Sequence, residues 1–396
     1  MIRCRRLAVV LVASCALLAG SPGAAWATAR VDDPTPAARV WTVAREQLLR
    51  LTGPTTTLPF GSTAGGRYRR TNAYAWTAGF FPASLWLLYA HGKDPAVLAA
   101  ARRYTDLVLP VARWRGTHDL GFIIGMPATL GAQFDPDADR QARYTVALST
   151  AATTLTARWN ARVGALKSAD YAGRWGVIID SAMNAPMLIR EGQRIGKRRG
   201  GRLADIGTRH LLTLASHFVR PDGSTFHRLA FNPRSGALVG PLPGQGLSVS
   251  STWARGQAWA IDGFAQGYAL TRDPRLLLAA RRTADFWISR VPSDTVPPWD
   301  LDVTKPNAPR DSSAAAIASD GLLTLALVEE DPARAVTYRT YAQTLLATLE
   351  NPPWVSSSNG TRGVLQRQAY SVAIDPREGT YVWGDAFLLK ALSLSG

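Results

Sequence analysis

The chain has 396 residues, of which 46% are hydrophobic and 19% are charged. This composition is typical of a globular protein with one large core or two ordinary domains. Its formal net charge of +16 would suit a nucleic-acid partner, but the basic residues are scattered and only the run GKRRGGR at 196–202 is tightly clustered. We therefore expect no nucleic-acid binding, and an acidic carbohydrate partner or arginine-rich codon usage explains the charge equally well.

The first 27 residues have the pattern of a secretory signal peptide. MIRCRR is a basic start, LAVVLVASCALLAG is an apolar run, and AWA at 25–27 is a small-x-small cleavage site. The run is shorter than the ~20 apolar residues of a membrane-spanning helix, and no later segment reaches that length without charges. We predict cleavage after Ala27 and secretion, with lipid anchoring at Cys15 of VASC as a less favoured alternative.

Both cysteines of the chain, Cys4 and Cys15, lie inside this leader. The chain that remains after cleavage therefore has no disulfide, no thiolate nucleophile and no cysteine-metal site.

From residue 35 onward, nearly every periodic segment has apolar residues at helical spacing. We predict eleven helical segments, and a single overlooked helix would make twelve. These segments span residues 37–51, 79–91, 95–113, 139–160, 176–193, 203–219, 254–271, 274–291, 312–329, 332–350 and 380–394.

Long Gly/Pro-rich loops at 53–70, 220–251 and 290–310 separate some of the helices, and loops of such length are usually functional. We expect one short hairpin, near 224–232. Helix pairs recur without a strict sequence repeat or a polar terminal cap, which argues against an open solenoid. We therefore predict an all-α fold, a closed toroid of helix pairs, in a single domain over 28–396.

One aspartate stands inside an apolar run, RWGVIIDSAMNAPMLI at 174–189. Burying a carboxylate costs several kcal/mol unless something compensates, and Asp180 is poorly placed to cap a helix. Burial raises the pKa of a carboxyl group, which lets it hold a proton near neutral pH and act as a general acid. We therefore predict a catalytic role for Asp180. At helical spacing Asn184 shares its face.

Other polar and aromatic residues recur where helices should begin. His118 and Asp119 of GTHDLGF precede an apolar run, and Asp119 would serve equally as the N-cap of a helix starting near Gly121. Arg255 lies one helical turn before a tryptophan, and a structural ion pair with Asp262 is the alternative to a role in binding. Aromatic faces combined with fixed polar groups are typical of sugar pockets.

Six motifs in the same order resemble glycoside hydrolase family 88, the unsaturated glucuronyl hydrolases. They are HDLGF, VIIDSAMNAPMLI, RPDGSTFH, STWARGQAWAIDGFAQGY, PPWDLD and RDSSAAAIASDGLL. The resemblance runs from about Trp76 to the final YVWGDAFLLKALSL. It implies an (α/α)6 barrel with its active site at one end, and neither a metal nor an organic cofactor.

The resemblance also implies a reaction. The family's substrates are oligosaccharides with a 4,5-unsaturated uronic acid at the non-reducing end, left by polysaccharide lyases. The enzymes hydrate the C4=C5 vinyl ether, and the unstable product releases the remaining sugar. By motif, Asp180 is the general acid and base and Asp119 its essential partner. The substrate-binding positions that the resemblance implies are Trp76, His118, His227, Gln245, Arg255 and Trp259.

Three alternatives remain open on the sequence. An unsaturated rhamnogalacturonyl hydrolase would share the barrel and the acid. An inverting glycosidase would use Asp119 and Asp180 as acid and base on a saturated glycoside. A non-enzymatic binder of acidic polysaccharide would leave Asp180 unexplained. The segments GALKSADYAG and PLPGQG depart from the family pattern, so the parent polysaccharide stays open, and we expect a monomer.

Overall fold

The structure is a computed structural model of the chain, and it describes residues 35–63, 67–357 and 363–395. The predicted signal peptide, residues 1–27, lies outside the described residues, as does Cys15. The residues from Thr35 onward form one compact unit.

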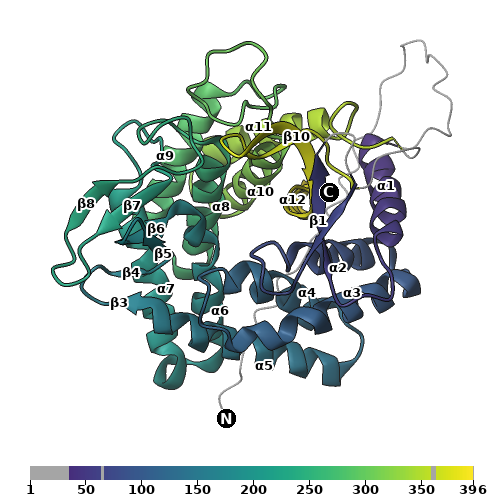
Figure 1. The fold of residues 1–396 in the computed structure, drawn as a ribbon, viewed down its shortest axis with the longest axis horizontal. Coiled ribbons are helices and arrows are strands. Elements are labelled where there is room, and N and C mark those ends of the chain that lie inside the picture. The colour runs from purple at the N-terminus through teal and green to yellow at the C-terminus, as the bar shows by residue number, and fades with distance from the viewer. Residues whose placement is uncertain (1–34, 64–66, 358–362, 396) are drawn as a thin grey trace, which may run out of the picture. The chain divides into compact units, whose positions relative to one another are not determined.

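Twelve α-helices in the described part of the chain alternate between an inner and an outer position. The inner helices are α2 (Phe80–Gly92), α4 (Met126–Phe134), α6 (Ala185–Ile195), α8 (Ala254–Thr271), α10 (Ser312–Val328) and α12 (Val382–Ser395). The outer helices are α1 (Pro36–Arg50), α3 (Pro95–Val108), α5 (Ala138–Leu155), α7 (Lys197–His217), α9 (Pro274–Arg290) and α11 (Pro332–Leu349). Helix α12 packs against α2 and closes the ring (Figure 1). The predicted all-α fold, an (α/α)6 barrel, is confirmed.

The two sets of helices differ in sequence because they differ in burial. Almost every residue of α8 and α10 is buried, and both sequences are rich in alanine and glycine, which allow close helix packing. Three outer helices instead begin with an Asp-Pro pair, in which Asp94, Asp273 and Asp331 accept hydrogen bonds from backbone amides of the first turn. An aspartate N-cap followed by proline is a strong helix start.

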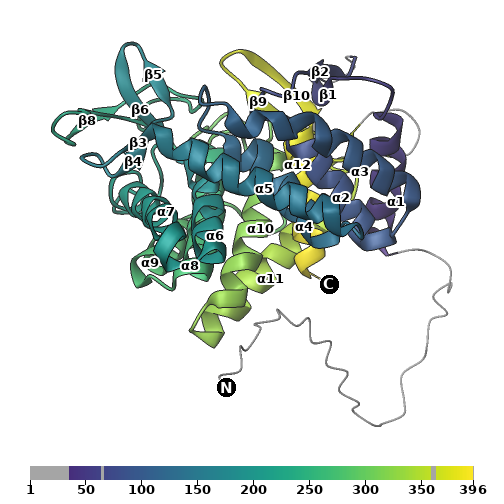
Figure 2. The same ribbon diagram turned by 90° about the horizontal axis from the view of Figure 1, so that it is seen from below.

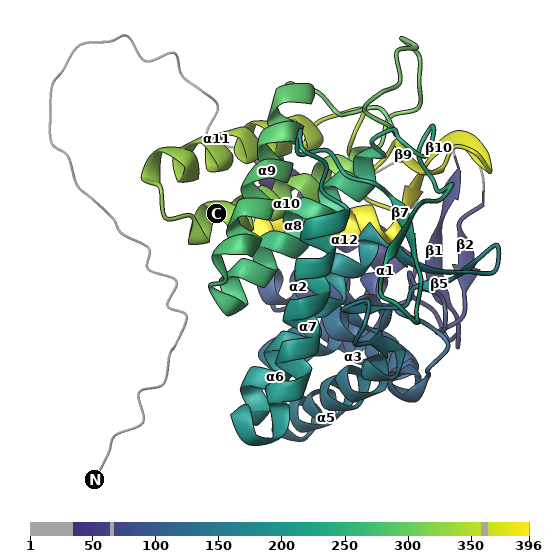
Figure 3. The same ribbon diagram turned by 90° about the vertical axis from the view of Figure 1, so that its left-hand side faces the viewer.

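Two four-stranded sheets lie at one end of the ring (Figure 2, Figure 3). The first contains β1 (Leu58–Thr63), β2 (Arg69–Thr71), β9 (Gln368–Ser371) and β10 (Asp375–Tyr381), in the order β2-β1-β10-β9. The second contains β5 (Ala169–Tyr171), β6 (Arg174–Ile178), β7 (Arg228–Phe231) and β8 (Leu238–Pro241), in chain order. A small hairpin joins β3 (Trp159–Asn160) to β4 (Ala165–Leu166).

The sheets place the starts of the inner helices. Strands β6, β8 and β10 are each followed by an inner helix, namely α6, α8 and α12. Strand β1 pairs antiparallel with β10, so hydrogen bonds between the two ends of the unit reinforce the closure of the ring. The inner helices that follow these strands therefore begin at the sheet end, and side chains from distant parts of the chain meet there.

The structure corrects the expected elements in two places. The segment 176–193 is not one helix, because it contains β6, a 3-10 helix (Ile179–Met183) and α6. Its β-branched residues at 177–179 favour a strand, and Pro186 suits the first turn of α6. The overlooked twelfth helix is α4, which has only nine residues.

The expectation of a single hairpin near 224–232 is also wrong. The described residues contain ten strands, and β7 pairs with β6 as well as with β8. These strands are two to seven residues long, too short for an alternating pattern to stand out in the sequence.

Candidate active site

Asp180 lies in the 3-10 helix between β6 and α6 and is 8% exposed. Its Oδ2 atom has no hydrogen-bond partner among the described residues. Burial raises the pKa of Asp180 to about 7, and the charge of Asp119 acts in the same direction, against the opposing effects of Arg255 and Arg228. A substantial fraction of Asp180 is therefore protonated near neutral pH.

His227 faces this carboxyl group from the loop before β7. Its Nε2 atom lies 3.6 Å from Asp180 Oδ2, and its Nδ1 atom accepts a hydrogen bond of 2.7 Å from the backbone amide of Gln245. Burial lowers the pKa of His227 to about 3, assisted by the charges of Arg228 and Arg255. The ring is therefore neutral, and because Nδ1 is an acceptor, Nε2 carries the proton and points it toward Asp180.

Asp119 lies just before the π-helical turn Gly121–Gly125 that leads into α4. Its Oδ2 atom accepts a hydrogen bond of 3.0 Å from the Thr117 hydroxyl, and its Oδ1 atom lies 3.3 Å from His118 Nε2 without hydrogen-bond geometry. The carboxylate does not cap the turn, so the N-cap alternative is wrong. Burial lowers the pKa of His118, against the opposing charge of Asp119, so His118 too is neutral at pH 7.

Asn184 joins the two aspartate-bearing segments. Its Oδ1 atom accepts hydrogen bonds from the backbone amides of Gly121 at 2.7 Å and Phe122 at 3.2 Å. The contact requires glycine, since a Cβ atom on Gly121 would lie 2.6 Å from Asn184 Cα. The start of the Asp119 turn is thus fixed against the end of the Asp180 helix, which holds the two carboxyl groups at the same end of the ring.

Arg255 is 1% exposed at the start of α8 and is neutralised by an acid. Its Nη1 atom is 2.6 Å from Asp311 Oδ2 and also donates to the carbonyl of Ala369, and its Nη2 atom donates to the carbonyl of Tyr370 and, at 3.2 Å, to Gln245 Oε1. Its Nε atom is buried and has no acceptor in the described residues. The alternative of a structural ion pair is therefore confirmed, with Asp311 as the acid in place of Asp262. Arg255 ties α8 to β9 and to the Gln245 loop, while its substrate-binding role stays a prediction.

The two predicted aromatic residues differ in exposure. Trp259 is fully buried, with Phe122 and Phe387 against its ring at centroid distances of 5.2 and 5.1 Å. Trp76 is half-buried, and its ring centroid lies 5.1 Å from that of Trp383. Substrate contact stays a prediction for both, and Trp76 has the more accessible ring.

Sequence reasoning missed Tyr171 and Arg228. In the β5-β6-β7 sheet, Tyr171 is opposite Arg174 and Arg228 is opposite Ile178, so both point to the same face. The Tyr171 ring lies over Gly176, where a Cβ atom would approach its Cδ2 atom to 2.3 Å. Alternation along RWGVI and RLAF was the signal that could have found this face.

Arg228 is a cation without an acidic partner in the described part of the chain. Its Cζ atom lies 3.6 Å from the centre of the Tyr171 ring, and its buried Nε atom has no hydrogen-bond acceptor. Burial raises the pKa of Tyr171 to about 12, partly offset by Arg228, and the charges of Asp180 and Asp119 also raise it. The phenol is therefore neutral and close to both carboxyl groups.

Among residues 35–63, 67–357 and 363–395, no group of three or more His, Cys, Asp or Glu side chains is arranged to hold a metal ion. No helix in the same ranges combines the length and the apolar character needed to cross a membrane.

Comparison with known proteins finds clear relatives. The chain is 33% identical over 348 residues to an unsaturated glucuronyl hydrolase of Bacillus sp. (strain GL1), covering 84% of this chain and 89% of the relative. It is 32% identical over 325 residues to an unsaturated glucuronyl hydrolase of Formosa agariphila, covering 80% of this chain and 79% of the relative. An unsaturated chondroitin disaccharide hydrolase of Streptococcus agalactiae is 29% identical, with 84% of each chain covered. No family model matches the chain.

Solved structures agree with these relatives. An unsaturated glucuronyl hydrolase specific for heparin superposes with a TM-score of 0.85 at 28% identity, covering 91% of this chain and 96% of the other. The Bacillus sp. GL1 enzyme, responsible for glycosaminoglycan degradation, has a TM-score of 0.79 at 28% identity, with 90% and 98% covered. A Streptococcus agalactiae enzyme variant complexed with dGlcA-GalNAc6S has a TM-score of 0.73 at 25% identity, with 90% of each chain covered.

We predict that Asn184→Ala lowers the pKa of Asp180, because the Asp119 segment is then no longer held beside it and its charge acts from further away. An NMR titration of the Asp180 carboxyl carbon measures this change. Asn232→Ala is the matched control, since Asn232 Oδ1 accepts from the amides of Arg234 at 2.9 Å and Ser235 at 3.2 Å in an exposed loop. Equal Asp180 pKa values in both variants would contradict the role of Asn184.

Proposed function

The chain belongs to the unsaturated glucuronyl hydrolases of glycoside hydrolase family 88, and on that premise we propose that Asp180 hydrates the 4,5-unsaturated glucuronic acid at the non-reducing end of its oligosaccharide substrates. The observation that carries this proposal is the buried Asp180 carboxyl group, with a pKa of about 7 and no hydrogen-bond partner on Oδ2 in the described residues. A group of this kind can give a proton to carbon near neutral pH and then take one back.

The reaction has two proton transfers at the same carboxyl group. Asp180 first donates its proton to C4, the C4=C5 electron pair forms the new C–H bond, and positive charge spreads over C5 and the ring oxygen. Water then adds to C5 and gives a proton to the Asp180 carboxylate, which restores the acid. The resulting hemiketal opens, and its rearrangement releases the remaining sugar.

The neighbours of Asp180 support both states of the carboxyl group. When Asp180 is deprotonated, the Nε2–H group of His227, now 3.6 Å from Oδ2, is placed to donate to the new anion after a small closure. Because His227 has a pKa of about 3, it does not compete for the proton. The negative charge of Asp119 favours the cation that develops at C5.

Arg228 is the residue we assign to the uronate carboxylate. It has no acid to neutralise it in the described residues, its Nε atom is buried, and the Tyr171 ring fixes its guanidinium at 3.6 Å. A partly buried guanidinium held in this way can form charge-assisted, bidentate bonds to a carboxylate. Arg255 is less suited to this role because Asp311 already neutralises it.

The alternatives fit less well. The curated relatives are named for glucuronyl and chondroitin disaccharide substrates, which favours a glucuronyl over a rhamnogalacturonyl substrate. A simple binding protein would have no use for a buried, unpartnered carboxyl group. For the parent polysaccharide we propose glycosaminoglycans, because similar proteins are named for heparin and for chondroitin disaccharides. We further propose that the chain is secreted after cleavage of residues 1–27 and acts as a monomer.

We predict that Asp180→Asn lowers kcat by at least ~10²–10⁴, the usual contribution of a positioned acid, while the fold is retained. In the parent enzyme kcat should fall as the pH rises above about 7, because Asp180 then loses the proton that it must donate. Loss of the ultraviolet band of unsaturated disaccharides measures both effects. Asp205→Asn, an exposed position on α7, is the control, and near-normal turnover by Asp180→Asn would remove Asp180 from the mechanism.

We predict that Arg228→Gln raises KM by about tenfold or more and changes kcat less, because the carboxylate is bound in both the ground and the transition state. Arg174→Gln is the matched control, since Arg174 is exposed on the same face of the neighbouring strand. A methyl ester of the unsaturated uronate should abolish the difference between parent and variant. A KM difference that persists with the ester would place the Arg228 contact elsewhere.

The position of hydrogen in the product separates hydration from glycosidic cleavage. In D2O, hydration must leave one deuterium on C4 of the keto product, whereas cleavage at C1 would leave the C4=C5 bond and its absorbance intact. NMR of the product from a wild-type digest reads the outcome directly. A released sugar that still carries the alkene would favour the inverting-glycosidase alternative.

A further inference from the structure

A second groove lies beside the β5-β6 hairpin and has a volume of about 540 Å³, within the range of small-ligand sites. The residues of interest in its lining are Arg115, Arg158, Trp159, Lys167, Asp170 and Trp175. None of them belongs to the set proposed for the reaction at Asp180.

The groove has an excess of positive charge, since Arg115, Arg158 and Lys167 line it with a single acid, Asp170. The Arg158 guanidinium donates to the backbone carbonyls of Lys167, Ser168 and Arg115 at 2.6, 2.6 and 2.9 Å, and pairs with no acid in the described residues. Lys167 is paired with Asp170 at 2.6 Å. Arg115 is exposed, and its side chain has no partner in the described part of the chain. The carbonyls fix Arg158 in place, the carboxylates of Asp119 and Asp170 act on it only from beyond ion-pair distance, and exposed Arg115 adds a further positive charge.

Two half-buried tryptophans stand among these cations. Arg209 lies over the Trp159 ring at 5.2 Å, and Trp175 meets Phe231 edge-on at 6.3 Å. Fixed indole rings beside unneutralised guanidinium groups are suited to a sugar that carries an anionic group, since a ring stacks on the apolar face of a pyranose and a cation binds its carboxylate or sulfate.

The groove and the reaction centre lie on opposite faces of the same hairpin. Tyr171 is opposite Arg174, and Asp170 is opposite Trp175, so neighbouring residues along each strand point to opposite sides. Tyr171 points toward Arg228, whereas Asp170 and Trp175 line the groove. Figure 2 shows β5 and β6 projecting at the sheet end of the ring, beyond the helices.

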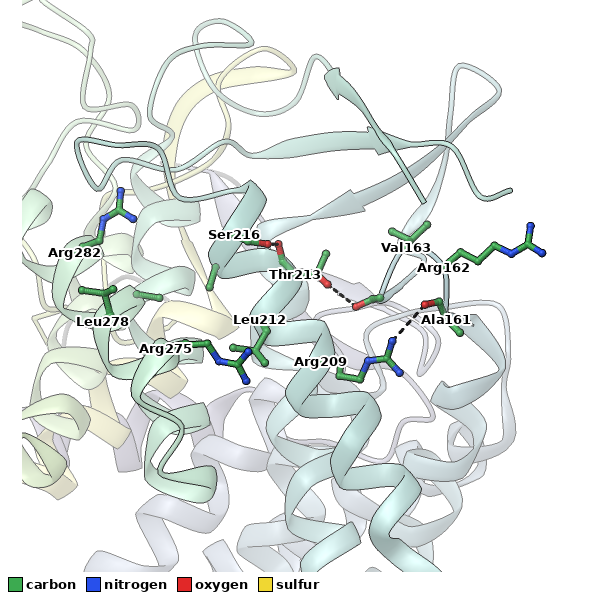
Figure 4. Close-up of a pocket in the computed structure, with 13 residues that line it drawn as sticks. Ala161, Arg162, Val163, Arg209, Leu212, Thr213, Ser216, Arg275, Leu278 and Arg282 are labelled. Carbon is green, nitrogen blue, oxygen red and sulfur yellow. Dashed lines mark hydrogen bonds between the residues drawn. The ribbon is translucent and has the colours of Figure 1, made fainter. Parts of the chain in front are cut away.

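A groove of similar volume between α7 and α9, drawn in Figure 4, lacks the aromatic rings that a sugar site requires. It has a volume of about 570 Å³ and contains four arginines, but no aromatic ring lines it. Arg275 is neutralised there by two bonds to Asp273, and Arg162 points away from the other labelled side chains.

We propose that the groove behind the β5-β6 hairpin is a second carbohydrate site, which binds a uronate- or sulfate-bearing sugar residue independently of the reaction centre. The ligand class rests on the proposed function, whereas the groove and its charge do not. Such a site would hold the enzyme on an acidic polysaccharide while chain ends are processed at Asp180.

Calorimetric titration of the Asp180→Asn protein tests the proposal. The probes are saturated hyaluronan and chondroitin 6-sulfate hexasaccharides, which lack the C4=C5 bond, with cellohexaose as the neutral probe. The titration is repeated with Arg228→Gln added, which removes the carboxylate contact proposed at the reaction centre. We expect the acidic hexasaccharides to bind and cellohexaose not to bind. Binding of the hyaluronan hexasaccharide would show that a carboxylate is sufficient for recognition. Tighter binding of the chondroitin 6-sulfate hexasaccharide would show that the groove also recognises sulfate.

The variants Arg115→Ala and Trp175→Ala, each added to Asp180→Asn, should raise the Kd of the acidic hexasaccharide by about tenfold. Arg113→Ala is the matched control, because Arg113 is exposed two residues before Arg115 and lies outside the groove. Equal Kd values in all three variants would overturn the proposal, as would loss of hexasaccharide binding on the addition of Arg228→Gln alone. Turnover of the unsaturated disaccharide by the parent enzyme is measured separately, so a failure of the proposed function can be told apart from a failure of the second site.

Discussion

Asp180 keeps one carboxyl oxygen away from both water and hydrogen-bond donors, and the arrangement of the site follows from that constraint. A buried carboxylate without donors would cost several kcal/mol, so the group holds its proton near neutral pH instead. The neutral His227 and the nearby Asp119 preserve this state, because neither supplies a positive charge that would stabilise the anion. The fold thus stores an acid where a carboxyl group in water would have lost its proton.

The helical ring holds Asp180 in its buried position. Inner helices such as α8 and α10, buried along almost their whole length, provide a rigid frame, and the short strands at one end add side chains such as Val177, Leu229 and Tyr381 to the same core. Two polar ties then fix the active segments. Asn184 joins the Asp119 and Asp180 segments, and Arg255 joins α8 to β9 and the Gln245 loop. Both ties are buried, so removing either one leaves donors or acceptors without partners.

The arginines of the chain differ in whether an acid neutralises them. Arg255 is neutralised by Asp311 and acts as part of the frame. Arg228 and Arg158 have no acid partner in the described residues, and they lie near opposite faces of the β5-β6 hairpin. One faces the proposed reaction centre and the other the proposed second groove. The two proposed anion sites therefore each use a local arginine rather than one basic surface, which agrees with the scattered basic residues in the sequence.

The sequence by itself determined most of the helices and the apolar setting of Asp180. Helical periodicity is local, so the segment 254–271 was predicted with the bounds that α8 has, and Asp180 was identified because its chain neighbours are apolar. Only the tertiary structure decided the partners. Asn184 meets an amide 63 residues away, and Arg255 selects Asp311, 56 residues on, rather than the nearer Asp262. Tyr171 and Arg228 meet only because β6 separates their strands. Such contacts depend on ring closure and strand register, which hydrophobic spacing within a segment does not encode.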